Sequence, residues 1–262
     1  MGQATLETLG RADRTGTLPR LGGMARPDGV VIVSERFWAF AGVDGSLREG
    51  TMTPAPRPLR RVPLLRGLLR LGAAISPIVS RRGVVRARER WFVIGAIFAS
   101  FGFFLLPGRL DFIAGLVLSV LMLAWILRGR TLHLHGAEHR AIRAAEDRTL
   151  VGAWSGRVLP SRFAARCGTN FAALLLPVAA TFDLLWPLPA ALVALFSLGL
   201  TMELWTAIEG RTHRVARAFV IPGLLLQRLT TREPSLAETQ VALRATASVL
   251  HRELAAQTSE KT

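Results

Sequence analysis

Residues 112–127 read FIAGLVLSVLMLAWIL, and residues 128–139 continue as RGRTLHLHGAEH. The first stretch carries no charge and is near the lower limit of the roughly 17–25 apolar residues that cross a bilayer as a helix. The second stretch begins with two arginines and ends with two histidines and a glutamate. The chain therefore passes, within a few residues, from a membrane-type segment to a polar segment with potential metal ligands.

Similar apolar blocks occur at residues 91–107, 171–186 and 190–205. Short turns separate the paired blocks, at Pro107 to Asp111 and at Pro187 to Pro189. We therefore predict a mainly α, polytopic membrane protein with four transmembrane helices in two hairpins, which occupy residues 91–127 and 170–208.

Arginines next to the apolar blocks supply much of the net charge of +15, whereas the turns within the pairs hold only Arg109. The positive-inside rule then places both termini and the loop of residues 128–169 in the cytoplasm, as in a protein of the bacterial inner membrane. Basic clusters beside spans usually meet anionic lipid head groups, so we expect membrane lipids as partners and no nucleic acid. The sequence leaves protein partners unknown.

Two further features bear on the compartment. The first twenty residues lack an apolar run, so the sequence predicts no signal peptide. Cys167 is the single cysteine, which excludes an intrachain disulfide and suits a reducing compartment.

The segments before the first hairpin differ in character. Residues 1–20 predict a flexible tail, and residues 21–50 predict a small β element with strands near residues 29–34 and 37–43. Residues 51–90 predict a basic linker and a helix. That helix, over residues 64–79, places arginines among leucines, which favours an interfacial or re-entrant position over a fifth span.

Residues 209–262 predict a cytoplasmic C-terminal segment. Ser235 and Glu238 have the spacing of a capping box, which marks the start of a helix. An apolar stripe follows at helical spacing, so we predict an amphipathic helix that docks on the protein or on the membrane. The stripe contains Leu236, Leu243, Ala247, Leu250 and Leu254.

The histidine motif has the spacing of a metal site. On a helix, His135 and His139 stand one turn apart on one face, with Glu138 beside them. Cys167 and Glu203 are the candidates for a third ligand, because the predicted topology brings both to the depth of this helix. A divalent metal, with zinc as the candidate, would bind there, and Glu138 would act as base towards a water molecule whose pKa falls to about 7 on zinc. Alternatively, the histidines form a solvated, histidine-rich helix face.

Three segments resemble the YqhQ-like family of bacterial membrane proteins. They are residues 135–139, HGAEH; residues 166–171, RCGTNF; and residues 222–234, from Pro-Gly to TTREP. The likeness runs from about Gly22 to Leu254. The family is uncharacterised, and its members are sometimes described as predicted metal-dependent enzymes. The resemblance therefore implies that this chain is a metal-dependent enzyme.

The chain departs from the family pattern in two places. Residues 22–30 keep the glycines but lack a glutamine, and Ala164-Ala165 stands where the family tends to carry His-Pro. If that histidine were an essential ligand, this chain would have lost it. Cys167 and Glu203 are both present.

Residues around the motif allow two interpretations each. Cys167 is either a ligand or nucleophile, or a small buried side chain, and Asn170 is a candidate helix cap. Arg228, Thr230 and Arg232 either line a pocket and contact lipid head groups, or serve only to tie down a loop.

From these patterns we expect an inner-membrane, metal-dependent enzyme of hydrolase type at the cytoplasmic face. The alternative is a non-catalytic membrane assembly factor, an adaptor or a small transporter. No nucleotide-binding loop, dinucleotide fingerprint, nucleophile elbow or paired-cysteine motif occurs, so nucleotide-driven transport and redox chemistry have no support.

Overall fold

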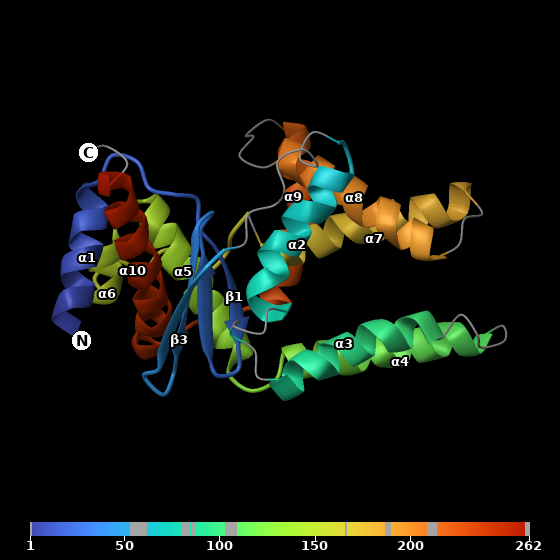
Figure 1. The fold of residues 1–262 in the computed structure, drawn as a ribbon, viewed down its shortest axis with the longest axis horizontal. Helices are drawn as coiled ribbons and strands as arrows, with labels where there is room; N and C mark the ends of the chain where they lie inside the picture. Colours follow the sequence, from blue (N-terminus) through green and yellow to red (C-terminus); the bar gives the residue numbers. More distant parts are fainter. Residues whose placement is uncertain are drawn as a thin grey trace.

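The computed structural model is mainly helical with one small antiparallel sheet (Figure 1). It describes residues 2–52, 62–79, 84, 87–102, 109–165, 167–186, 190–208 and 214–259. The two expected hairpin turns and part of the expected basic linker lie at least partly outside these ranges. The sheet and four helices form one end of the molecule, and long helical arms extend from the other end.

The sheet is a four-stranded meander in the order β1-β2-β3-β4. Its strands are β1 Gly22–Arg26, β2 Gly29–Val33, β3 Phe37–Gly42 and β4 Leu47–Thr51. The small N-terminal β element is thus confirmed, with two more strands than its apolar pattern predicts. β1 begins with two glycines and β4 is a polar edge strand, so neither carries the apolar signal of a central strand.

Four helices and the sheet are together called the cap. The helices are α1 Gly2–Arg14, α5 Thr131–Glu146, α6 Leu150–Trp154 and α10 Leu236–Ser259. Helices α5 and α10 cover one face of the sheet, and helices α1 and α6 pack on them from the other side (Figure 1). The largest apolar core of the described residues lies between the four helices and the sheet, and it includes Ile32, Leu134, Leu150, Leu243 and Leu250.

Helix α1 corrects the prediction of a flexible tail over residues 1–20. Leu9 and Ala12 are fully buried in the core. The carboxylate of Asp13 accepts hydrogen bonds of 3.0 Å from the backbone N–H groups of Leu150 and Val151, so it caps the start of α6. The tail is ordered by contacts with residues more than a hundred positions away, which a local reading of residues 1–20 does not detect.

Helix α10 begins as its sequence predicts. Ser235 Oγ accepts from the backbone N–H of Glu238, and the Glu238 carboxylate accepts from the backbone N–H of Ser235 at 2.9 Å. Four members of the predicted stripe are buried, but Leu236 is 46% exposed because it lies in the first turn, beyond the edge of the core. The C-terminal amphipathic helix therefore packs on the cap itself.

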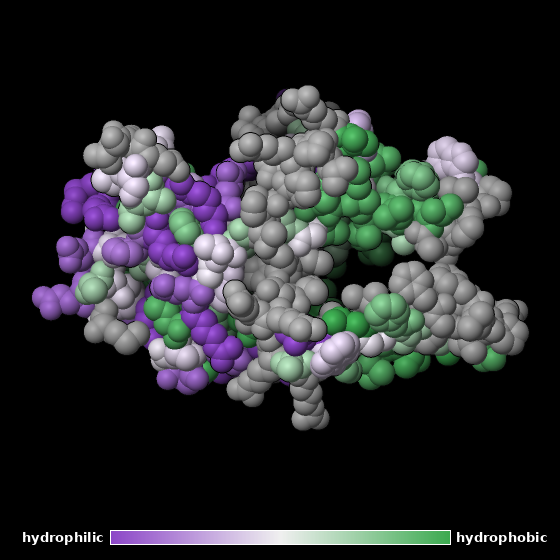
Figure 2. Space-filling view, viewed as in Figure 1, coloured by the Kyte–Doolittle hydropathy of each residue, from purple (hydrophilic) through white to green (hydrophobic). Residues whose placement is uncertain are grey.

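The described residues form six more helices outside the cap. They are α2 Leu65–Val79, α3 Ala87–Gly102, α4 Arg109–Ile126, α7 Gly168–Leu185, α8 Ala190–Ile208 and α9 Arg214–Thr230. Figure 2 shows hydrophobic residues gathered over these arms and hydrophilic residues over the cap. Many large apolar side chains of the arms are exposed, among them Leu121 on α4, Leu176 on α7 and Leu225 on α9.

Within the described residues, α7 is the helix that is both long and apolar enough to cross a membrane. Residues 113–126 of α4 pass the same test only together with α5, at a bend of 67°. The apolar parts of α8 and α9 are shorter. These helices are weak evidence for a membrane location, and they do not establish the predicted four spans.

A matched pair of leucines tests the position of α10. Leu243 is fully buried, whereas Leu236 on the same helix is 46% exposed. We expect Leu243→Ala to lower the free energy of unfolding by about 2–5 kcal/mol, because it leaves a cavity in the core. Leu236→Ala should change it by about 0.5 kcal/mol or less. Denaturant unfolding of the detergent-solubilised chain measures both, and equal effects would contradict this packing.

Candidate metal centre

Helix α5 carries the histidine motif across the centre of the cap. It runs without a break through Gly136, although glycine weakens helices. A Cβ on Gly136 would lie 2.3 Å from the carbonyl oxygen of Arg232, so a larger residue would displace the chain that crosses here. The backbone N–H of Arg232 donates to the Leu132 carbonyl at 2.9 Å, which fixes this crossing. Glycine at this position therefore serves close packing.

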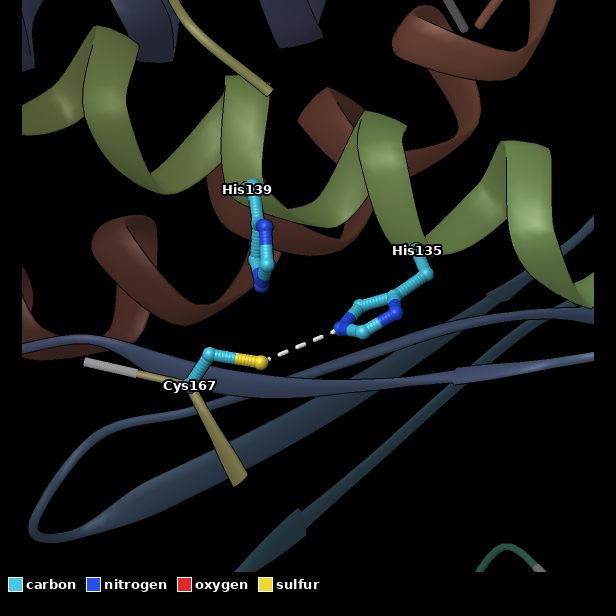
Figure 3. A group of neighbouring side chains, drawn as sticks. All are labelled: His135, His139 and Cys167. Atoms are coloured by element: carbon cyan, nitrogen blue, oxygen red, sulfur yellow. Dashed lines mark hydrogen bonds between the residues drawn. The ribbon is translucent and has the colours of Figure 1, made fainter. Parts of the chain in front are cut away.

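Three side chains converge beside α5 (Figure 3). One potential ligand atom each of His135, His139 and Cys167 lies within 4.8 Å of the other two. His135 Nε2 is 3.3 Å from Cys167 Sγ, and the two imidazole rings are 4.5 Å apart between centroids. Among the histidine, cysteine and acidic side chains of the described residues, these three are the set whose ligand atoms lie close enough together to hold one metal ion.

Backbone carbonyls determine how both imidazoles are protonated. His135 Nδ1 lies 2.8 Å from the Thr230 carbonyl oxygen, and His139 Nδ1 lies 2.7 Å from that of Arg162. A carbonyl oxygen can only accept, so each Nδ1 must carry the hydrogen. In a neutral imidazole the other nitrogen, Nε2, then presents a lone pair. The His139 lone pair is available to a metal, and the His135 lone pair becomes available when the Cys167 thiol, 3.3 Å away, loses its proton.

One of these lone pairs is unsatisfied. His139 is 1% exposed, and its Nε2 has no hydrogen-bond partner among the described residues. A buried polar atom without a partner costs on the order of 1–3 kcal/mol. Figure 3 shows this nitrogen directed towards the other two side chains, so a cation bound between them would remove this cost.

Cys167 is positioned by the start of α7. It is the N-cap residue of that helix, and its Sγ accepts from the backbone N–H of Thr169 at 3.4 Å. A helix N-terminus favours negative charge, so this location suits a thiolate ligand. Thr169 Oγ1 in turn lies 3.4 Å from Thr230 Oγ1, which joins α7 to the end of α9.

A buried amide pair holds the segment ahead of Cys167. Gln227 and Asn170 are both fully buried. The Gln227 side chain accepts from the Ala164 N–H at 3.0 Å and donates to the Ala164 carbonyl at 2.8 Å. Asn170 donates to the carbonyls of Ala164 and Ala165 and accepts from Gln227. Asn170 is thus not the cap of α7 but a support for the backbone of Ala164 and Ala165, shortly before the cysteine.

A buried guanidinium connects the two loops that orient the histidines. Arg140, 5% exposed, donates to the Pro160 carbonyl at 3.0 Å and to the Glu233 carboxylate at 2.5 Å. The first partner lies two residues before Arg162, whose carbonyl orients His139. The second lies three residues after Thr230, whose carbonyl orients His135. Arg140 therefore positions both carbonyls indirectly.

Glu138 lies outside the group of three. Its side chain packs against β1, where a Cβ on Gly23 would stand 2.7 Å from Glu138 Cγ. Burial raises the pKa of the Glu138 carboxyl to about 7, and the nearby His135 opposes this shift. The predicted base is therefore a buried carboxyl that changes its charge near neutral pH.

Glu203 does not join the group, which corrects its prediction as a ligand. Its carboxylate accepts from Arg66 Nε at 2.7 Å and from Arg66 Nη2 at 2.5 Å. Arg66 lies on α2, and α2 packs closely on α8 because Gly67 meets the Gly199 carbonyl. An arginine with this bidentate contact occupies the carboxylate, so it is not free to bind a metal.

The remaining predicted site residues lie at the end of α9. Thr230 contributes its backbone carbonyl to His135. Arg228 is exposed, and the exposed Arg232 donates to the carbonyls of Arg228 and Thr231 at 2.9 and 3.2 Å. The last turn of α9 is thus part of the surroundings of the group.

Sequence reasoning missed the supporting residues Arg140, Gln227 and Gly23. Arg140 follows His139 directly, and an arginine inside an otherwise buried helix face is a signal of a specific partner. Gln227 and Gly23 carry no comparable signal, because their partners lie far away in the sequence.

The fold and the group of side chains define a mainly helical protein with a sheet-containing cap and a buried His–His–Cys group. The model of a family described as proteins of unknown function, DUF1385, matches residues 107–252, more than half of the chain. The chain belongs to this family, and the YqhQ-like resemblance is consistent with that. No curated protein and no solved structure matches the chain.

The burial of Glu138 predicts a pH dependence of stability in metal-stripped protein. Its pKa is about 7 in the folded chain and 4.5 in its ordinary state. Below pH 4.5 the carboxyl is protonated whether the chain is folded or not, so burial of a charge costs nothing there. As the pH rises from 4.5 to 7, folding opposes ionisation and wild-type stability falls, by about 3 kcal/mol at most.

Glu138→Gln removes this cost. Thermal unfolding should show the variant gaining stability relative to wild type at pH 8 and much less at pH 5. If the difference in stability between Glu138→Gln and wild type did not change with pH, this would contradict the buried, uncharged state of Glu138.

Proposed function

We propose that the chain is a membrane-associated metal-dependent enzyme, a hydrolase, with His135, His139 and Cys167 as ligands of a divalent metal such as zinc. The observation that carries the proposal is the orientation of the two imidazoles. Both Nδ1 atoms are committed to carbonyls, and both Nε2 atoms face the Cys167 side of α5. Histidines that bind metals usually donate their other ring N–H in this way.

The number of ligands supports a catalytic role. Structural zinc sites have four protein ligands, whereas catalytic sites have three and an open position. The group contains three ligand residues within the described part of the chain. A zinc ion bound there would supply Lewis acidity and lower the pKa of a coordinated water to about 7.

Glu138 is the residue that we assign as the proton acceptor. A carboxyl with a pKa near the working pH both accepts and returns a proton efficiently. Its pKa of about 7 meets this requirement. In hydrolysis of an ester or amide, it would take a proton from the attacking water and pass one to the leaving group. His135, three residues earlier on the same helix, is close enough to influence its charge.

The location that we propose is the bacterial inner membrane, with four spans and the cap in the cytoplasm. The arms support this because their exposed surface is apolar (Figure 2). Trp125 also stacks under the Arg128 guanidinium, 4.3 Å from its ring centroid, at the cap end of α4. Tryptophan with arginine is typical of a membrane–water interface on the cytoplasmic side.

The alternative of a small transporter loses its main support. That alternative rested on Glu203 as an ionisable group within a span. Arg66 pairs with this carboxylate in bidentate geometry. An assembly factor or adaptor remains the alternative function, and it predicts that the histidines are dispensable.

Metal content tests the proposal. Protein purified in detergent without a histidine tag should bind about one zinc ion per chain after loading, measured by mass spectrometry of the metal. The His135→Ala/His139→Ala double variant should lose it. His133→Ala is the matched control, because His133 lies on the same helix but outside the group, and it should keep the metal.

A second arm tests catalysis. Glu138→Gln should keep the metal, because its carboxylate lies outside the group of ligands. It should reduce the hydrolysis of p-nitrophenyl esters by about 10²-fold or more, as expected for loss of a general base. Equal zinc content in the double variant and wild type would refute the metal site. Metal binding with unchanged turnover in Glu138→Gln would refute the assigned role of Glu138.

A further inference from the structure

We propose that the ligand of this site is an anionic lipid, whose acyl chain lies along the outer face of α9 and whose phosphate lies at the end of that helix. This inference rests on the proposed metal-dependent function and names its substrate class. It comes from an apolar stripe, a pair of arginines and a direct connection to His135, which lie in the last three turns of α9 or within two residues of its end.

The stripe is formed by Ile221, Leu225 and Leu229. These residues follow one another at four-residue intervals, so they lie on one side of the helix. Their side chains are 52%, 53% and 66% exposed. At 1.5 Å per residue, the stripe is ~12 Å long, which is the length of a medium acyl chain. Exposed apolar side chains in such a continuous row mark a surface for an apolar partner.

Two cations stand near the end of the stripe in the sequence. Arg228 and Arg232 flank its last leucine, and both are exposed. Within the described part of the chain, neither forms an ion pair with a carboxylate. Arg232 uses one terminal nitrogen to bind two backbone carbonyls, which holds its guanidinium near the end of the helix. Exposed guanidinium groups beside an apolar stripe complement a phosphate attached to an acyl chain.

The end of α9 leads directly to the candidate metal centre. Thr230 follows Leu229, and its carbonyl accepts from His135 Nδ1 at 2.8 Å. The backbone of Arg232 is hydrogen-bonded to the first turn of α5, at Leu132. A lipid head group held by the two arginines would therefore lie beside the helix that carries both histidines.

The stripe favours a lipid over a free phosphate. A small anion would gain from the arginines alone and would leave the leucines exposed. An amphiphile gains from both, and the free energy of burying apolar surface adds about 25 cal/mol per Å². The chemistry that matches the whole surface is thus an acyl chain joined to an anionic head, as in phosphatidylglycerol.

The test uses protein in which cobalt replaces zinc, because cobalt bound to a thiolate and two imidazoles has a visible absorption spectrum that responds to the ligand in the open position. The probes are dihexanoyl phosphatidylglycerol, glycerol 3-phosphate and dihexanoyl phosphatidylcholine in a non-ionic detergent. We expect the phosphatidylglycerol to change the spectrum at a concentration at least tenfold lower than the other two.

Variants separate the two halves of the surface. Arg228→Gln/Arg232→Gln should raise the phosphatidylglycerol concentration needed by about tenfold or more, as expected for the loss of two cations near an anionic lipid. Leu229→Asn should raise the concentration of phosphatidylglycerol that changes the spectrum, and it should leave the concentration of glycerol 3-phosphate needed for the same change unaffected. Arg214→Gln is the control, because Arg214 is exposed at the opposite end of α9. All variants should show the wild-type cobalt spectrum without lipid.

The outcomes separate a failure of the lipid proposal from a failure of the proposed metal-dependent function. No cobalt spectrum in wild type would refute the metal site itself. A normal spectrum that responds equally to glycerol 3-phosphate and to the lipid would refute the lipid and indicate a small phosphate. A spectrum that responds to the lipid equally in wild type and in the arginine double variant would refute the role of α9.

Discussion

Two hydrogen bonds between imidazole Nδ1 atoms and backbone carbonyls determine what the His–His–Cys group can do. If the Thr230 and Arg162 carbonyls were absent, each ring could turn and adopt either tautomer. With them, both rings present Nε2, and one of these nitrogens is buried without a partner. The proposed metal site thus depends on loops that contribute no ligand atom.

The rest of the cap can be understood as the means of holding those carbonyls in place. Gly136 lets the chain at Arg232 cross α5 at close range. Arg140 joins the loop at Pro160 to the loop at Glu233. These contacts connect segments about 70 residues apart in the sequence, so the site forms only when the loops before α7 and after α9 dock on the same helix.

The candidate metal centre also lies where the cap meets the arm helices. Cys167 is the N-cap of α7, and Thr230 ends α9, so two arm helices terminate at the group. Arg26 of β1 also pairs with Glu89 of α3 at 2.9 Å. The helix to which we assign lipid binding and the cap thus meet at the candidate metal centre.

Features with a local signal could be predicted from the sequence. The capping box at Ser235 and the helix over the histidine motif follow from spacing and from apolar periodicity, whereas Cys167 was one of two candidate third ligands, with Glu203, that rested on the predicted topology. Features set by distant partners could not be predicted. For Glu203 the sequence allowed either a ligand role or an ion pair with an arginine of residues 211–217, and it did not predict the actual partner, Arg66 of α2, 137 residues away in sequence. Helix α1 likewise gains its order from Leu150 and Val151, which Asp13 caps.

X-ray absorption spectroscopy of the zinc-loaded protein tests the central claim most directly, because it counts the atoms around the metal. Two imidazole nitrogens at about 2.0–2.1 Å, one sulfur at about 2.3 Å and one further light atom are the shell that the convergence of His135, His139 and Cys167 predicts. A shell without sulfur, or with four or more light atoms and no imidazole signature, would contradict it.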